Sequence, residues 1–270
     1  MFSGKTSPSR PHPAMNNPRL LLLAPAVALT SFFVLVPALL LLRVSLYEPA
    51  RGRGFYTAST ATLENFAQLG NADTAGMFGF TLLFAACIAA CSIGIGFPLA
   101  LWIRSLTARC QWFALVLVLL PKTAGLLAML FGLQRLLPRG FVGALIAETS
   151  LILPYAVLVL VVQLRAINPV WIAAARGLGA SRWQVFRRIV VPLALPGLVL
   201  AGELGFIWGL GAFLGPAFLG GPEEMTIAGD IHRQAFEYNR WPRAAAEAIA
   251  LLLLVGLILL VAARWRGRTR

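Results

Sequence analysis

Charged residues are scarce in this 270-residue sequence, because Asp, Glu, Lys and Arg make up only 12% of it. Soluble globular domains have roughly twice that share. Acidic residues are rarest: 10 Asp and Glu stand against 23 Lys and Arg, for a formal net charge of +13. A nucleic-acid-binding protein carries such an excess on a soluble surface, which a chain that is 59% hydrophobic mostly lacks. The composition therefore predicts an integral membrane protein with no nucleic-acid partner.

Side chains that ligate metals or perform catalysis are also few. Cys87 and Cys91 lie one helical turn apart and Cys110 follows alone, without the cluster that a thiolate metal site needs. The two histidines, His12 and His232, are far apart, so no zinc-protease motif is present. We therefore expect no metal, no cofactor and no catalytic residue in this chain, and a membrane enzyme is disfavoured.

Long apolar runs are abundant instead. A helix needs about 20 apolar residues to cross the hydrocarbon core. Residues 19–264 are therefore expected to form one all-α transmembrane domain with six transmembrane helices. A disordered basic tail is expected before it, at 1–18, and a short basic tail after it, at 265–270. The six spans are placed at about 20–42, 76–103, 112–133, 141–164, 193–214 and 244–263.

The distribution of arginine and lysine predicts the orientation of these spans. With both termini in the cytoplasm, the inside segments hold 14 basic residues and no acidic ones, whereas the outside segments hold 8 basic and 7 acidic residues. Basic residues concentrate on the cytoplasmic side of membrane proteins. The sequence therefore predicts that both termini are cytoplasmic.

The connection between the fourth and fifth spans is predicted to contain two short helices. Asn168 can cap the first helix with Pro169 in its first turn, and Gly179 can end it. Ser181 and Gln184 have the spacing of a capping box for the second helix. Such a pair could lie on anionic lipid headgroups or dock on another protein.

The residues of this connection resemble a known motif. Ala174-Ala175, Gly179 after three residues and Ile189-Val190-Val191-Pro192 after nine more have the spacing of the EAA loop. That loop marks the permease subunits of binding-protein-dependent ABC importers. Two positions depart from it, since Ala173 stands in place of Glu and Val191 in place of Leu.

Further segments are similar to the same family, whose members have the MetI-like type I importer fold. Within the family, these segments are most similar to the spermidine/putrescine branch. Importers of iron(III), thiamine and phosphonate are related to it. The segments are Leu63-Glu64-Asn65-Phe66, Gly220-Gly221-Pro222, Arg233-Gln234-Ala235-Phe236 and Trp241-Pro242.

The resemblance implies a multi-pass subunit of the bacterial inner membrane that forms the substrate path. Its implied partners are a dimer of cytoplasmic ATPase subunits that binds ATP and magnesium, a second and distinct permease subunit, an extracytoplasmic substrate-binding protein and the lipid membrane. The implied contacts with the ATPase are Ala173, Ala174, Ala175, Arg176, Gly179, Ser181, Arg182, Ile189 and Pro192.

Four residues are candidates for the translocation path. Three are charged groups at membrane depth, which usually face a cavity or a partner, and the resemblance implies that span five borders the path. The fourth is a tryptophan on span five that could contact either substrate or lipid. They are Lys122, Glu148, Glu203 and Trp208. Lys122 and Glu148 could instead pair between spans, and Glu247 could pair with Arg243, four residues before it.

Glycine and proline are too dense after the fifth span for a straight helix. The resemblance to the permease family implies that this stretch lies near the outer gate, so its residues are candidates for a gate or hinge. The candidates are Gly215, Pro216, Gly220, Gly221 and Pro222. Within the fifth span, Gly205 and Gly209 allow close helix packing, either inside the subunit or against another. A self-sufficient secondary transporter remains the alternative function, although six spans without visible repeats give it little support.

Overall fold

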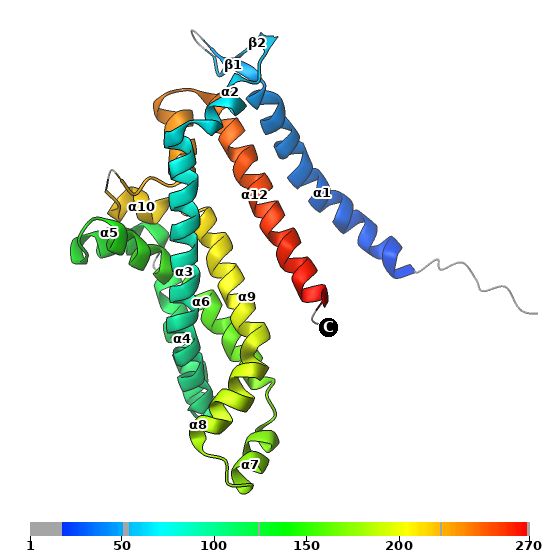
Figure 1. The fold of residues 1–270 in the computed structure, drawn as a ribbon, viewed down its shortest axis with the longest axis vertical. Helices are drawn as coiled ribbons and strands as arrows, with labels where there is room; N and C mark the ends of the chain where they lie inside the picture. The colour runs from blue at the N-terminus through cyan, green and yellow to red at the C-terminus, as the bar shows by residue number, and fades with distance from the viewer. Residues whose placement is uncertain (1–17, 51–53, 124, 222, 269–270) are drawn as a thin grey trace, which may run out of the picture.

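The computed structural model describes residues 18–50, 54–123, 125–221 and 223–268, in which long helices dominate (Figure 1). The longest are α1 (Pro18–Ser45), α3 (Ala72–Ser105), α4 (Ala108–Thr123), α6 (Phe141–Arg165), α9 (Val191–Leu210) and α12 (Trp241–Arg268). Shorter helices are α2 (Glu64–Ala67), η1 (Gln68–Gly70), α5 (Leu126–Leu136), α7 (Pro169–Gly177), α8 (Arg182–Val185), η2 (Phe186–Val190), α10 (Leu214–Leu219), α11 (Ile227–His232) and η3 (Arg233–Glu237).

Five of the six expected spans correspond to one long helix each among the described residues. The fifth was placed too far along the chain, because α9 ends at Leu210 and Leu214 already begins α10. Gly211 is the C-cap residue of α9. The sixth span is longer than expected, since α12 continues to Arg268. Residues 1–17, which make up most of the first expected tail, and residues 269–270, the end of the second, lie outside the described residues.

The expected third span, 112–133, is not a single straight helix. Helices α4 and α5 meet there at 91°, and they form a sixth crossing only if the bent pair is counted as one span. Two residues explain the break. Pro121 lies in the last turn of α4, and Gly125 has a φ of 85°, which an L side chain rarely adopts. Hydropathy detects the apolar run but not the break within it.

The core of the molecule is the contact between α3, α6 and α9, which Figure 1 shows side by side. Small side chains let these helices approach closely. A Cβ added at Gly205 would lie 3.0 Å from the Cα of Ala89, and one added at Gly209 would lie 2.5 Å from the Cα of Ala85. Gly205 and Gly209 therefore pack against α3 within the subunit, which is one of the two interpretations of these glycines.

Helices α1 and α12 form a separate pair that diverges from the core bundle (Figure 1). The apolar side chains of α1 described in the structure are mostly exposed, such as Phe33 and Leu39. Lipid or another subunit must cover this surface.

A two-stranded antiparallel hairpin follows α1, and the sequence analysis did not predict it. Its strands are β1 (Tyr47–Pro49) and β2 (Tyr56–Ala61). The buried amide of Asn65 donates hydrogen bonds to the carbonyl oxygens of Ser45 and Tyr47, both at 2.9 Å. Asn65 thereby ties α2 to the end of α1 and the start of the hairpin.

Candidate coupling loop and translocation path

The first helix of the connection between α6 and α9 has the expected ends. The Asn168 side chain accepts a hydrogen bond from the Val170 amide at 2.9 Å, and Pro169 occupies the first turn. The helix ends before Gly179, whose φ of 85° lies in the left-handed region. The local prediction from the sequence is confirmed, so α7 is a short helix with defined ends.

The second helix begins with the predicted capping box. The backbone amide of Gln184 donates to Oγ of Ser181 at 3.2 Å, and the backbone amide of Ser181 donates to Oε1 of Gln184 at 2.8 Å. The chain then continues through the π-helical turn η2 into α9, with Pro192 as its second residue. No loop separates them, so α8, η2 and α9 form one continuous helical segment.

The outer face of α7 is exposed and partly apolar. Ala173, Ala174 and Arg176 are exposed, whereas Ala175 packs against the core. Trp171 and Leu178 are large apolar residues that the sequence analysis did not select, and Leu178 is 90% exposed. Helical periodicity around the small alanines is the signal that could have found them. Exposed apolar residues beside a small-residue face are typical of a docking surface.

The remaining predicted residues of this loop divide between surface and core. Gly179, Ser181 and Arg182 are exposed. Ile189 packs on the core cluster formed by α3, α6 and α9. Ile189 therefore anchors the loop, while the other three residues are accessible to a partner.

The base of the loop is fixed to the neighbouring connection between α3 and α4. Arg104 donates to the carbonyl oxygen of Ile167 at 3.2 Å, and Arg165 donates to Oε1 of Gln111 at 2.5 Å. The Gln111 amide in turn donates to the carbonyl oxygens of Arg104 and Leu106. Side-chain hydrogen bonds thus hold the connection between α3 and α4 against the base of the connection between α6 and α9.

A cavity of about 530 Å³ lies between α6, α9 and the start of α5. Its lining is mostly apolar, with Glu148 and Trp208 as the polar side chains. Of the four path candidates, these two line it directly. Glu203 is half-buried and lies elsewhere on α9.

Glu148 is the centre of the polar contacts at this cavity. Its side chain is buried, with 2% exposure. One carboxylate oxygen accepts a hydrogen bond from Nε1 of Trp208 at 2.8 Å, and the other accepts one from the Gly215 amide at 2.7 Å. A buried carboxylate requires such donors, so Glu148 fixes both the Trp208 ring and the start of α10.

Lys122 does not form the direct ion pair with Glu148 that was one of the two interpretations. Ion pairs that the described residues do form include Arg233–Asp230 and Arg243–Glu247. The Lys122 ammonium instead lies 4.8 Å from the centre of the Tyr155 ring and 5.2 Å from that of Trp208. The Trp208 ring therefore lies between the two charged groups.

The predicted gate is a packed short helix. Gly215 and Pro216 of α10 are buried, and the Leu219 carbonyl accepts a hydrogen bond from the Gly140 amide at 2.7 Å. The Gly221 amide donates to Oε2 of Glu224 at 2.6 Å.

The other two gate candidates are Gly220 and Pro222. A Cβ at Gly220 would lie 2.4 Å from the Pro216 carbonyl oxygen, so the turn after α10 requires glycine. Pro222 lies outside the described residues. The hinge role of all five residues stays a prediction.

Residues 83–268 match the family described as "Binding-protein-dependent transport system inner membrane component". The chain belongs to this family. It is a permease subunit of an ABC importer with the MetI-like type I fold, a multi-pass component of the inner membrane, as the sequence resemblance implied.

Curated relatives cover most of the permease. It is 28% identical over 252 residues to the spermidine/putrescine transport system permease protein PotB of Haemophilus influenzae, with 85% of this chain and 87% of the relative covered. PotB of Escherichia coli K12 is 25% identical over 257 residues, with coverage of 87% and 92%. The molybdenum transport system permease protein ModB of Azotobacter vinelandii is 30% identical over 203 residues, with coverage of 66% and 89%.

Solved structures share the fold. A chain of a bacterial ABC transporter involved in the import of the acidic polysaccharide alginate has a TM-score of 0.67 and 18% identity, with 93% of the permease and 95% of that chain covered. A chain of the bacterial alginate ABC transporter in complex with an alginate pentasaccharide-bound periplasmic protein has a TM-score of 0.69 and 17% identity, with coverage of 93% and 94%.

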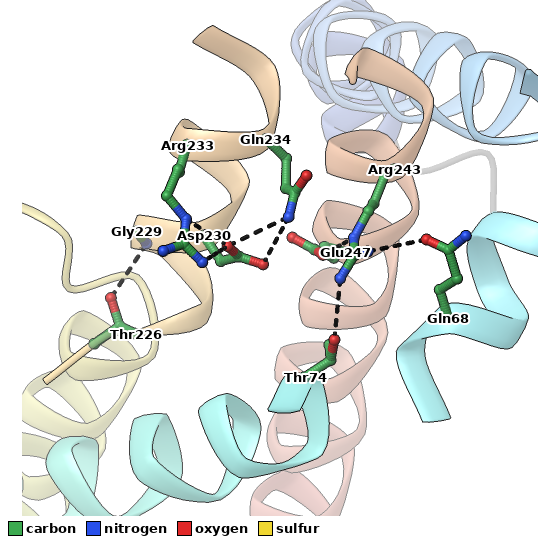
Figure 2. Close-up of polar contacts among 9 residues, drawn as sticks. All are labelled: Gln68, Thr74, Thr226, Gly229, Asp230, Arg233, Gln234, Arg243 and Glu247. Atoms are coloured by element: carbon green, nitrogen blue, oxygen red, sulfur yellow. Dashed lines mark hydrogen bonds and ion pairs between the residues drawn. The ribbon is translucent and has the colours of Figure 1, made fainter. Parts of the chain in front are cut away.

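A buried polar cluster joins α3, α11 and α12 of the permease at the end opposite to α7 (Figures 1 and 2). Glu247 pairs with Arg243 at 3.1 Å, which confirms the predicted pair. Arg243 also donates to Gln68 at 3.0 Å and to Thr74 at 3.3 Å. Glu247 is fully buried, so Arg243 compensates its charge and links three elements.

The second ion pair of this cluster lies on α11 and η3. Arg233 donates to Oδ1 of the buried Asp230 at 2.7 Å. Burial lowers the pKa of the Arg233 guanidinium, but the hydrogen bond and negative charge of Asp230 raise it more, so the net shift is upward. The ion pair with Asp230 therefore favours the charged form of Arg233.

Replacing Arg243 by Met is expected to lower the free energy of unfolding by about 2 kcal/mol, because Glu247 would lose its buried donor. The shift in thermal unfolding of the detergent-solubilised permease measures this. Arg240→Met is the control, since Arg240 is exposed. Equal shifts for the two variants would contradict a structural role of the cluster.

Replacing Glu148 by Gln is expected to cost about 2 kcal/mol, because an amide has one acceptor oxygen and two donors face it. The buried Gly215 amide or the Trp208 indole would then lack an acceptor. Thermal unfolding measures the loss, with Glu237→Gln at an exposed position as the control. Unchanged unfolding would show that the two hydrogen bonds contribute little.

Proposed function

We propose that this permease carries linear polyamines such as spermidine and putrescine across the inner membrane. The observation that supports the substrate is the similarity to PotB proteins along 85–87% of the chain. The apolar cavity agrees with it, since aromatic rings and a flexible carbon chain make favourable contacts there.

The exposed α7 helix is proposed to be the coupling helix, seated in a groove of an ATPase subunit that binds ATP and magnesium. Its exposed Trp171 and Leu178 supply an apolar docking face, and its direct connection through α8 and η2 to α9 provides a mechanical path to the cavity. ATP binding would then bias the permease between inward-open and outward-open states.

Three further partners complete the proposed assembly. A second, similar permease would cover the exposed faces of α1 and the open side of the cavity. A substrate-binding protein would dock at the end that carries the hairpin and α11, and both termini would be cytoplasmic. The lack of acidic residues in the segments predicted to lie inside supports this orientation.

Uptake of radiolabelled spermidine tests the substrate. The permease is produced with its second permease, ATPase and binding protein in cells that lack their own polyamine uptake. We expect ATP-dependent accumulation that excess putrescine inhibits. No accumulation of spermidine, with ATP-dependent uptake of molybdate, iron(III), thiamine or a phosphonate by the same cells, would assign a different substrate to the same machinery.

Co-purification tests the assembly. The proposal predicts a stable complex with the ATPase and ATP turnover that rises when loaded binding protein is added. Transport by the permease alone in liposomes, driven by an ion gradient, would contradict it and support the secondary-transporter alternative.

A further inference from the structure

An aromatic pair, Tyr155 and Trp208, lies at the cavity, which Trp208 lines, and it already holds a cation from the chain itself. The Lys122 ammonium lies 4.8 Å from the Tyr155 ring centre and 5.2 Å from the Trp208 ring centre. Both distances are within the range of favourable cation–π contacts, which extends to about 6 Å. Both rings are also partly accessible, with exposures of 45% for Tyr155 and 36% for Trp208. Two accessible rings on facing helices are therefore arranged around one ammonium group.

The Glu148 carboxylate beside these rings already has hydrogen-bond donors within the protein. Both oxygens of Glu148 accept hydrogen bonds, from Trp208 and from the Gly215 amide, and the side chain is 2% exposed. By accepting from the indole N–H, Glu148 holds the Trp208 ring in place and adds negative potential at its edge. The ring faces, and not the carboxylate, are thus the accessible cation-binding surface of this cavity.

Lys122 lies beside a sharp bend of the chain. It lies in the last turn of α4, next to Pro121, and the chain turns by 91° between α4 and α5. Gly125 beyond it has a φ of 85°. A change in the angle of this break would carry the ammonium away from the rings without disturbing α6 or α9.

We propose that Tyr155 and Trp208 form a binding site for an alkylammonium group of the transported substrate, and that Lys122 occupies this site as a tethered competitor. The proposal rests on the proposed polyamine transport and deepens it. When the ammonium of the substrate enters, the Lys122 ammonium leaves the rings. Since Glu148 contacts both Trp208 and the start of α10, the occupied site is directly connected to the predicted gate.

The chain offers an unusually clear probe of this site, because Lys5 and Lys122 are its only lysines. Reductive methylation with ¹³C-formaldehyde labels them and the N-terminal amine, and a dimethylated lysine keeps its positive charge. The full chain is labelled in nanodiscs of phosphatidylglycerol, a lipid without an ammonium headgroup, so that any competing ammonium comes from the added probe. Lys122→Gln assigns the signal.

We expect the Lys122 methyl signal to lie upfield of the Lys5 signal, because the rings shield it. Putrescine, spermidine or butylammonium should move it to the Lys5 position. Tyr155→Leu and Trp208→Leu should remove the upfield shift, and Tyr155→Phe, which keeps the ring, should retain it. Coincident Lys122 and Lys5 signals in the unmodified sequence would overturn the ring site. A shifted signal that these ammonium probes leave in place, or that only a dicarboxylate such as succinate moves, would overturn the competition.

Uptake by the assembled transporter provides the second measurement. Trp208→Leu should raise the KM for spermidine about tenfold, and Lys122→Met should lower KM, because the competitor is gone. A KM that is unchanged in both variants would overturn the proposal. Absence of spermidine uptake by the unmodified transporter would instead refute the polyamine substrate, and the methyl signal with butylammonium would still decide on the ammonium site.

Discussion

Replacing Ala174 by Phe is expected to reduce ATP-driven uptake at least tenfold while leaving the thermal unfolding of the isolated permease unchanged. Ala174 is exposed on α7, so a phenyl ring there meets solvent in the isolated chain. In the assembled transporter, the same ring would have to fit into the groove that α7 occupies. Loss of a central interface contact costs about 2 kcal/mol or more, which exceeds a tenfold change in affinity.

Two measurements distinguish lost coupling from lost folding. Co-purification of the ATPase with the permease reports docking, and unfolding in detergent reports the fold. Ala108→Phe is the matched control, because Ala108 is exposed at the start of α4, on the neighbouring connection at the same end. Full uptake by Ala174→Phe, or equal loss in both variants, would contradict the assignment of α7 as the coupling helix.

Replacing Gly209 by Val is expected to destabilise the permease by more than about 3 kcal/mol, because the added atoms overpack the contact between α9 and α3. The first of them would lie 2.5 Å from the Cα of Ala85, and backbone cannot move aside as a side chain can. The two helices must therefore separate. Thermal unfolding in detergent should show a large decrease, or the variant should not accumulate in the membrane.

Gly94→Val is the control for this prediction. Gly94 lies in α3, is exposed, and has no atom within 4 Å of the position that its Cβ would take. Its replacement introduces the same β-branched side chain in a helix without a clash, so only a small change is expected. A similar decrease for both variants would show that helix propensity, and not the contact with α3, determines the effect.

The local structure of the coupling loop could be predicted because its signals are local. The cap of Asn168, the stop at Gly179 and the capping box of Ser181 each involve groups within a few residues of one another. The side chains that fix the base of the loop could not be predicted. Gln111 and Arg165 are 54 residues apart and nothing in their spacing indicates a contact.

The path candidates show the same division. Rarity of charged residues at membrane depth selected Lys122, Glu148 and Glu203. The structure places Glu148 and Trp208 at one cavity and Lys122 against the Trp208 ring, whereas Glu203 lies elsewhere on α9. Which of these side chains contact one another could not be predicted. A pair between Lys122 and Glu148 was one of two interpretations, and in the structure both groups contact the Trp208 ring instead. Trp208 comes from α9, and hydropathy contains no information on how helices are rotated.

The sequence by itself determined that this permease lies in a membrane, which family it belongs to and where most of its spans lie. Apolar length, basic loops and the spaced EAA-like motif are all properties of the linear chain. The tertiary structure alone decided where the third span breaks and which face of each helix lines the cavity. It also decided that the Lys122 ammonium lies against two aromatic rings. Such contacts depend on the relative rotation of helices distant in sequence, which close packing of small residues sets.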